Sequence, residues 1–491
     1  MRVKAWCALF GVGLMGCGGV EPELLEGAPE DATVHAQACA PGTATKVKDV
    51  LPPGTDLPPW RPSPSGLTNV QGTLYFAVNL FPNHSLLWKS DGTTAGTVPV
   101  KDFPAYGISG YRDLGGLIAV GHQLFFSVND PTVGRELWVS DGTDAGTRLV
   151  ADLTPGTAST SLSGLASVGG TLSFFRRDPA TNGLLLWKSD GTAAGTVQVL
   201  ALEPQASLAS SVVLSSGLRV FILQDAVFGG TRVWRSDGTA AGTYAFTSLD
   251  AGEPQVRDMR SQGAFAVFAL AEGGNTELWK TDGTAAGTAR LETFGHDARL
   301  LGVLGSHVYV SYPTTDDRLK LARVSLAGGG KATVTTLANP FAGQEGAQPY
   351  VQDAKTAGNK LYLSVAIGSP GPAPRRVDLW GTDGTAAGTA RLSEGLSTSD
   401  ERASTLFDSG SGTLIFGSAG DSAGEEPWVT NGTAAGTARI ADIQSMGGSN
   451  PNSFLRIGTR IFFVANGGPP GNALWSMPAN VTCPALSAEA R

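Results

Sequence analysis

The sequence predicts an all-β protein built from one repeated unit, and three observations lead to this prediction. Glycine and proline, which favour turns, account for 66 and 29 of the 491 residues, well above average usage. Hydrophobic residues make up 41% of the chain and charged residues only 16%, a composition that supports a core and excludes a disordered chain. The third observation is a unit of 45 to 50 residues, rich in β-branched and aromatic residues, that recurs along most of the sequence.

The net charge excludes one class of partner. The chain has 35 Lys and Arg residues against 43 Asp and Glu residues, for a formal net charge of −8. Proteins that bind nucleic acid need an excess of basic residues to neutralise phosphates. We therefore expect no nucleic-acid partner.

Residues 1–16 are typical of an export signal. Arg2 and Lys4 precede an apolar stretch, 5–14, that is too short to span a membrane. The next residues, Leu14-Met15-Gly16-Cys17, resemble the lipobox of bacterial lipoproteins. This resemblance implies that Cys17 carries the lipid and that the protein is an outer-membrane lipoprotein, on the periplasmic or the surface face, attached to the membrane through the lipid only. An ordinary secretory signal is the alternative, and it also exports the protein.

Residues 17–40 are predicted to form a flexible acidic tether. Five acidic residues lie between positions 21 and 31, and no Lys or Arg follows Cys17 before Lys46. The stretch has no periodic apolar face that could pack on a core. A tether of this kind would hold a lipid-anchored domain clear of the membrane.

The four cysteines support an exported protein with one disulfide. Cys7 lies in the predicted signal peptide and Cys17 in the lipobox, which leaves Cys39 and Cys483. In an oxidising compartment, two remaining cysteines indicate a disulfide. These two residues flank the predicted folded region.

Eight of the ten tryptophans define the repeat. They are Trp88, Trp138, Trp187, Trp234, Trp279, Trp380, Trp428 and Trp475. All but Trp475 precede a turn of the type SDGTAAGT, whose acidic residue is Asp91, Asp141, Asp190, Asp237, Asp282 or Asp383, with Asn431 in one copy. Successive tryptophans are 45 to 50 residues apart, except for one interval of 101 residues. A degenerate unit with Ala322 in place of tryptophan fills that interval, so that there are nine units if it is complete.

A period of this length with strand-like content predicts a β-propeller with one four-stranded blade per unit. The motif, for example ELWVSDGTDAGT at 136–147, resembles the ELWxxDGT repeat family of bacterial lipoproteins and secreted proteins over about residues 41–478. The resemblance implies a propeller-like β fold and no particular reaction. The degenerate unit leaves a ring of eight or of nine blades open.

The second unit shows the expected strands. They are 114–120, 124–128, 136–139 and 147–151. The Asp-Gly pair between the last two is a strong hairpin signal, because glycine accepts a positive φ. We expect the second glycine of the turn, Gly146, to occupy another left-handed or bulge position. Each tryptophan gives its blade a large apolar surface.

The last unit lacks its fourth strand, and the N-terminus contains a replacement. No DGT turn follows Trp475, whereas residues 41–50 resemble the fourth strand of other units. We therefore predict that this N-terminal strand completes the last blade and that a Cys39–Cys483 disulfide locks the closure. The propeller would span 41–483, followed by a tail at 484–491.

Strand order assigns the connections of each unit to two faces. The turns between the first and second and between the third and fourth strands are short and uniform, whereas the other connections vary widely. Variable loops on a rigid scaffold commonly carry binding, although a solvated rim is the alternative for any one residue. The candidate binding residues are His84, Tyr106, Tyr111, Arg176, Arg177, Asp178, Phe228, Asp316, Asp317, Arg375 and Arg376.

The sequence indicates no metal or cofactor. A calcium loop needs several carboxylates at alternate positions, and no DGT turn has them at that spacing, so turn capping is the better interpretation. No HxxxH, HExxH or CxxC spacing occurs, which argues against zinc.

These observations favour a monomeric binding scaffold for an unidentified protein or glycan, without assigned catalytic residues. One alternative is a propeller enzyme that acts on a polysaccharide or a phosphoester through carboxylates and arginines at the central channel. The other is a purely structural component of the envelope. Propellers support both binding and catalysis, so the fold alone does not decide between these functions.

Overall fold

The structure is a computed structural model. It describes residues 37–40, 42–50, 62–80, 84–104, 114–225, 230–249, 254–368, 376–397, 405–421, 423–469 and 471–483. The predicted signal peptide, Cys17, most of the tether and the tail at 484–491 lie outside the described residues. The chain divides into Met1–His35 and Ala36–Arg491, and the fold is that of the second unit. In the described part of the chain, no helix is long and apolar enough to cross a membrane.

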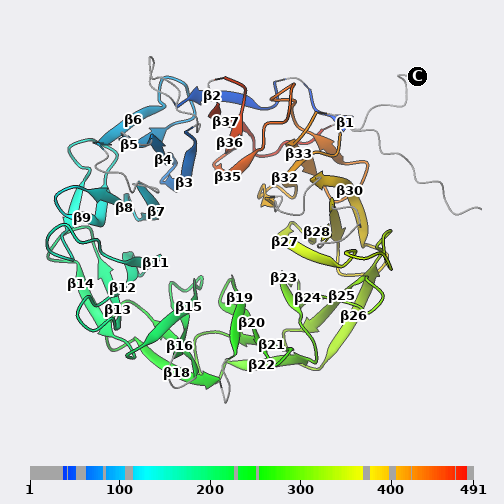
Figure 1. Cartoon of the computed structure of the whole chain (residues 1–491), viewed down its shortest axis with the longest axis horizontal. Coiled ribbons are helices and arrows are strands. Elements are labelled where there is room, and N and C mark those ends of the chain that lie inside the picture. Colours follow the sequence, from blue (N-terminus) through cyan, green and yellow to red (C-terminus); the bar gives the residue numbers. More distant parts are fainter. Residues whose placement is uncertain are drawn as a thin grey trace, which may run out of the picture. The chain divides into compact units, whose positions relative to one another are not determined.

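The described strands form nine sheets of at least four strands, which confirms the predicted propeller and the larger of the two blade numbers. In blades 1 to 7 the four strands follow one another in sequence and pair antiparallel, as in the second blade. Figure 1 shows the first strand of successive blades, such as β3, β7 and β11, at the inside of the ring.

The first three blades contain twelve strands. They are β3 (Pro64–Val70), β4 (Thr73–Leu80), β5 (His84–Ser90) and β6 (Val98–Pro104); β7 (Leu114–Val120), β8 (Gln123–Asp130), β9 (Gly134–Ser140) and β10 (Arg148–Ala151); and β11 (Leu162–Val168), β12 (Thr171–Arg177), β13 (Leu184–Ser189) and β14 (Val197–Ala201). The second blade has the four strands predicted for it, and its two middle strands are longer than expected.

Blades 4 to 6 follow the same order. They are β15 (Ala206–Val213), β16 (Arg219–Asp225), β17 (Thr231–Ser236) and β18 (Tyr244–Leu249); β19 (Gln255–Gln262), β20 (Phe265–Glu272), β21 (Asn275–Thr281) and β22 (Ala289–Phe294); and β23 (Arg299–Leu304), β24 (His307–Pro313), β25 (Leu319–Ser325) and β26 (Lys331–Leu337).

Blades 7 to 9 close the ring. They are β27 (Pro349–Ala357), β28 (Lys360–Ile367), β29 (Arg376–Thr382) and β30 (Ala390–Ser397); β31 (Phe407–Asp408), β32 (Leu414–Ser418), β33 (Glu426–Thr430) and β34 (Thr437–Arg439); and β35 (Asn452–Ile457), β36 (Arg460–Asn466) and β37 (Asn472–Pro478), completed by β2 (Thr45–Asp49).

The degenerate sixth unit is a complete blade. Ala322 pairs with Val310 on the neighbouring strand, at the position where Trp138 pairs with Phe126 in the second blade. Ala322 is buried although its side chain is small. The sheet of blade 6 therefore forms without the large aromatic residue, because the apolar residues around Ala322 still bury its position.

The N-terminal strand completes the last blade as predicted. β2 pairs antiparallel with β37, with Lys46 opposite Trp475, and the two strands lie side by side in Figure 1. Cys39 and Cys483 form the expected disulfide, with Cα atoms 4.7 Å apart. The closure removes an open sheet edge in the last blade.

The N-terminus also adds a strand that was not predicted. β1 (Gln37–Ala38) pairs in parallel with β34 and makes blade 8 a five-stranded sheet. The Cys39 amide continues this pairing by donating to the Arg439 carbonyl oxygen at 2.9 Å. The start of the folded chain is thus attached to two adjacent blades.

The core consists of layers between neighbouring blades. In the layer between blades 9 and 1, Phe76 and Trp88 pack with Phe462 and Leu474. Phe76 and Trp88 have ring centroids 6.0 Å apart, and the equivalent pair Phe268 and Trp279 has centroids 6.2 Å apart. The tryptophans therefore supply the apolar surface that the repeat predicted, and most lie beside a phenylalanine on the preceding strand, whereas Trp380 lies opposite Leu363.

Candidate functional site

The acidic residue of each DGT turn is held by the turn itself. The Asp141 Oδ1 atom accepts hydrogen bonds from the Thr143 amide at 2.9 Å and hydroxyl at 2.7 Å. These bonds hold the pKa of Asp141 below its usual value. The same contacts recur at Asp91, Asp190, Asp237, Asp282, Asp383 and Asn431.

The second glycine of the turn has a different role from the one expected. Gly142 has a φ of 89°, but Gly146 is not among the glycines with positive φ. A Cβ atom at Gly146 would lie 2.1 Å from the Asp141 carboxylate. The expectation of a second left-handed position was wrong, because the space taken by the aspartate, and not the backbone angle, requires glycine here.

The described residues contain no group of three His, Cys, Asp or Glu side chains that could hold a metal ion. Four of the predicted binding residues, Tyr106, Tyr111, Phe228 and Arg375, lie outside the described residues. His84 is the first residue of β5, where its backbone pairs with Leu80 and Pro104.

The predicted residues of blade 3 hold two connections, the one that enters the blade and the one between β12 and β13. Arg176 is buried, donates to the Leu153 carbonyl oxygen at 2.9 Å and lies over the ring of Trp187. Arg177 donates to the Asn182 carbonyl oxygen at 3.0 Å. The Asp178 carboxylate accepts the amides of residues 180 and 181, which lowers its pKa.

Two predicted residues from blades 6 and 7 contact the same connection, residues 338–348. The Asp317 carboxylate accepts the Gly343 amide at 3.1 Å. The Arg376 guanidinium lies over the ring of Phe341, 5.1 Å from its centroid, and pairs with the buried Asp378 at 2.9 Å. Asp316 instead pairs with Arg318 at 3.3 Å within its own loop. The predicted residues that the structure describes thus lie at separate blades and do not form one site.

A pocket of about 730 Å³ lies at the inner ends of blades 5 to 7, on the face of the variable connections. Residues at the starts of β19, β23 and β27 line it, together with the end of β24. Its charged residues are Arg257, Asp258, Arg260, Asp297 and Arg299. Three arginines and two aspartates give it a local excess of positive charge in a chain whose net charge is negative.

The two outer arginines of this pocket are accessible. Arg257 lies 3.9 Å from Asp297, and their side chains are 58% and 71% exposed. Arg299 is also exposed and donates to the Gln352 carbonyl oxygen at 2.8 Å. An ion pair this open is weak in water, so the guanidinium of Arg257 can exchange its partner for a ligand.

Two tyrosines complete the lining. The ring of Tyr312 packs against His296, with centroids 4.0 Å apart, and against Phe294 at 5.9 Å. Burial raises the pKa of Tyr312. Tyr350 is 40% exposed at the start of β27. The pocket therefore combines an aromatic ring fixed by packing with one that faces solvent.

Sequence reasoning did not single out the pocket residues. Arg257, Arg299 and Tyr350 stand at the starts of first strands, which were predicted to be scaffold. The strand registers place Arg299 and Tyr350 at one equivalent position, which Gln255 occupies in blade 5, whereas Arg257 stands two residues further along its strand. The sequence therefore has no signal that recurs at one position for all three residues. Only the ring brings the three positions together.

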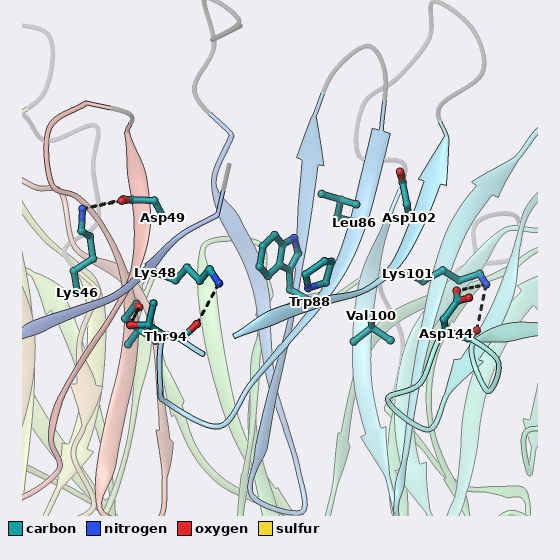
Figure 2. A pocket seen from close by; sticks show the side chains of 12 residues that line it. Lys46, Lys48, Asp49, Leu86, Trp88, Thr94, Val100, Lys101, Asp102 and Asp144 are labelled. Carbon is teal, nitrogen blue, oxygen red and sulfur yellow. Dashed lines mark hydrogen bonds and ion pairs between the residues drawn. The ribbon is translucent and has the colours of Figure 1, made fainter. Parts of the chain in front are cut away.

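A larger groove, of about 940 Å³, lies between the outer strands of blades 9 and 1. Figure 2 shows Trp88 with Lys48 and Lys101 on either side of it, and the lysines point to partners within the groove. Lys48 donates to the Thr97 carbonyl oxygen at 2.9 Å, and Lys101 pairs with Asp144 at 2.9 Å. This groove follows the seam of the closure, and its cations are already engaged.

Three acids with raised pKa values hold connections in place. Glu426 is fully buried and accepts the amides of Ile443 and Gln444, each at 3.1 Å, and the Ser449 hydroxyl at 2.6 Å. Glu136 and Asp378 have similar contacts in their own blades, and burial raises the pKa of all three. Their carboxylate oxygens accept hydrogen bonds that stabilise the fold, and none of the three residues lines the pocket of blades 5 to 7.

Three solved structures of peptidases match this chain at low similarity. A prolyl endopeptidase is 13% identical over 75% of this chain and 54% of its own, with a TM-score of 0.39. The β-propeller domain of the Trilobed protease from Pyrococcus furiosus is 10% identical over 69% of this chain and 100% of that domain, with a TM-score of 0.34. Prolyl oligopeptidase B from Galerina marginata is 13% identical over 76% of this chain and 55% of its own, with a TM-score of 0.39.

This chain thus spans about half the length of the two prolyl peptidases. At these identities and TM-scores the likeness carries no argument about activity or ligand. No protein-family model and no curated protein matches the sequence. The class that the fold defines is a nine-bladed propeller closed by its N-terminal strand, and the resemblance to ELWxxDGT repeat lipoproteins stays a prediction.

Proposed function

We propose that this protein is a lipid-anchored binding scaffold of the cell envelope, and that its ligand enters the pocket at the inner ends of blades 5 to 7. The observation that carries this proposal is the combination of the exposed Arg257, Arg299 and Tyr350 in one cavity. Rigid strands place these residues, and accessible guanidinium and aromatic groups in a concave site are typical of ligand recognition.

Two tyrosines of similar exposure make a matched test. The purified full-length chain is screened on arrays of glycans and peptides, and Tyr350→Ala is compared with Tyr244→Ala. Tyr350 is 40% exposed in the pocket, and Tyr244 is 46% exposed on the outer strand β18 of blade 4. Loss of array binding in Tyr350→Ala alone is the expected result. Equal binding by both variants, or no binding by the wild type, would reject the pocket as the binding site.

The anchor rests on the sequence Leu14-Met15-Gly16-Cys17. Expression in a bacterial host with an alkyne-labelled fatty acid should label the wild type, and Cys17→Ser should abolish the label. A wild-type chain that is exported without label would identify the N-terminus as an ordinary secretory signal and remove the anchor from the proposal.

A further inference from the structure

We infer that the pocket of blades 5 to 7 takes an acidic glycan, a short stretch of uronate-containing polysaccharide whose carboxylates meet Arg257 and Arg299. This inference rests on the proposed function, because it names the ligand class of the same site. The pocket volume of about 730 Å³ lies within the ordinary range for ligand sites, about 300–1,000 Å³.

The arginines indicate a carboxylate. A guanidinium presents planar, paired donors that match the two oxygens of a carboxylate. Arg257 currently faces Asp297 across 3.9 Å, a loose contact between two exposed groups. A ligand carboxylate can displace Asp297 and form a closer pair, and Arg299 offers a second guanidinium in the same cavity.

The main-chain edges beside the pocket disfavour a peptide. An extended peptide would bind by pairing with the free edge of a first strand. On β27, however, the carbonyl oxygens of Gln352 and Ala354 already accept from Arg299 and Arg260, and on β23 the Leu301 carbonyl oxygen accepts from Arg260. The acceptors that a peptide strand needs are therefore engaged, and recognition is left to side chains.

The rest of the lining suits sugar rings. Tyr350 provides a flat apolar face with a polar hydroxyl, and Pro313 and Pro349 extend the apolar surface. The Tyr312 ring is already packed against His296 and lies under the Lys320 ammonium, so it forms the wall of the pocket. A pyranose ring has apolar C–H faces and polar edges, so it can cover a tyrosine while its carboxylate reaches an arginine. An exposed aromatic ring and two accessible guanidinium groups in one cavity therefore suit a chain of such rings.

Three variants of the full-length protein separate the contributions. Arg257→Ala and Arg299→Ala should each weaken binding of oligogalacturonate about tenfold or more, because each removes a charge-assisted hydrogen bond. Asp297→Asn should strengthen binding, because it frees Arg257. The matched control is Arg177→Ala, an arginine on the same face in blade 3 that donates to its own loop. Thermal unfolding of each variant checks that the fold is kept.

Calorimetric titration uses three probes of similar length, namely oligogalacturonate, its methyl ester and oligoglutamate. The expected result is binding of oligogalacturonate alone, dependent on Arg257 and Arg299. Equal binding of the neutral methyl ester would contradict recognition of the carboxylate. Equal binding of oligoglutamate would contradict the assignment of a glycan. Either result leaves the proposed binding pocket intact. If none of the three binds although the arrays show binding at Tyr350, the ligand class is wrong and the proposed function stands.

Discussion

The Arg260 guanidinium on β19 donates a hydrogen bond to the Ala354 carbonyl oxygen on β27 at 3.1 Å, although 94 residues separate them in the chain. The same Nη1 atom donates to the Leu301 carbonyl oxygen on β23 at 2.8 Å. One side chain thus joins the first strands of blades 5, 6 and 7. The pocket that these strands line is held together by its own arginine.

Arg260→Ala should lower the free energy of unfolding by about 1–3 kcal/mol, because it leaves two strand carbonyl groups without their donor. Arg257→Ala, on the same strand, removes only the exposed pair with Asp297 and should cost less than about 1 kcal/mol. Urea unfolding of both variants measures the difference. Equal free energies of unfolding for the two variants would show that the hydrogen bonds of Arg260 between the three blades do not stabilise the fold.

Glu426→Gln should change the pH dependence of stability. Burial raises the pKa of Glu426 in the folded protein above its ordinary value of 4.5, so its contribution to stability is complete below that value and declines as the pH rises through the folded pKa. Glutamine does not titrate. The stability lost in Glu426→Gln should therefore be larger at pH 4 than at pH 7, measured by urea unfolding across this range. A loss that grows with pH would contradict the direction of the shift.

Arg219→Leu should stabilise the protein at neutral pH by roughly 1–2 kcal/mol. The Arg219 side chain is fully buried, lies over the ring of Phe175 at 4.2 Å from its centroid, and donates to the hydroxyls of Ser173 and Ser211 and to the Gly164 carbonyl oxygen. No carboxylate in the described chain pairs with it, and the equivalent position in blade 3 is Leu172.

The pH dependence of this variant gives a second check. Burial lowers the pKa of Arg219 to about 9. Because a lowered pKa of a base penalises the folded state below that pH, the advantage of Arg219→Leu should shrink as the pH rises through 9. A variant that is less stable than the wild type at pH 7 would show that the hydrogen bonds of Arg219 outweigh its desolvation.

Removing the disulfide with Cys39→Ser/Cys483→Ser should lower the free energy of unfolding by up to about 5 kcal/mol, since the bond closes a loop across 444 residues. Reduction of the wild type should lower its melting temperature to that of the variant. Thiol titration of the exported wild type should detect neither cysteine before reduction. Two reactive thiols in the native protein would show that the disulfide does not form and that the ring closes without it.

The ring could be predicted from the sequence because its determinants are local and repeated. In one turn, the residues that interact are the Asp141 carboxylate, the Thr143 hydroxyl and the glycines, and they lie within a few residues of one another. Each copy of the unit therefore contains all the residues that its turn needs. The missing fourth strand after Trp475 likewise pointed to β2. The role of Gly146 was misjudged, because a glycine required by a neighbouring side chain and one required by its φ look alike in a sequence.

The pocket could not be predicted, since its residues come from three units and meet only in the ring. Nothing in the sequence around Arg260 indicates a bond to Ala354, which lies two blades away. The parallel pairing of β1 with β34 could not be predicted from the sequence either, because a strand of two residues has no recognisable pattern. Of the predicted binding residues, Asp317 and Arg376 contact one shared connection, but the pocket lies between first strands, whose sequence pattern indicates only scaffold.

The most direct test of the central claim is hydrogen–deuterium exchange of the full-length protein with and without oligogalacturonate. Binding in the pocket of blades 5 to 7 should slow exchange at the starts of β19, β23 and β27, the three strands that line it. Exchange in the groove beside Trp88 should not change. Slower exchange at the DGT turns or in that groove, with none at the three strand starts, would contradict the account.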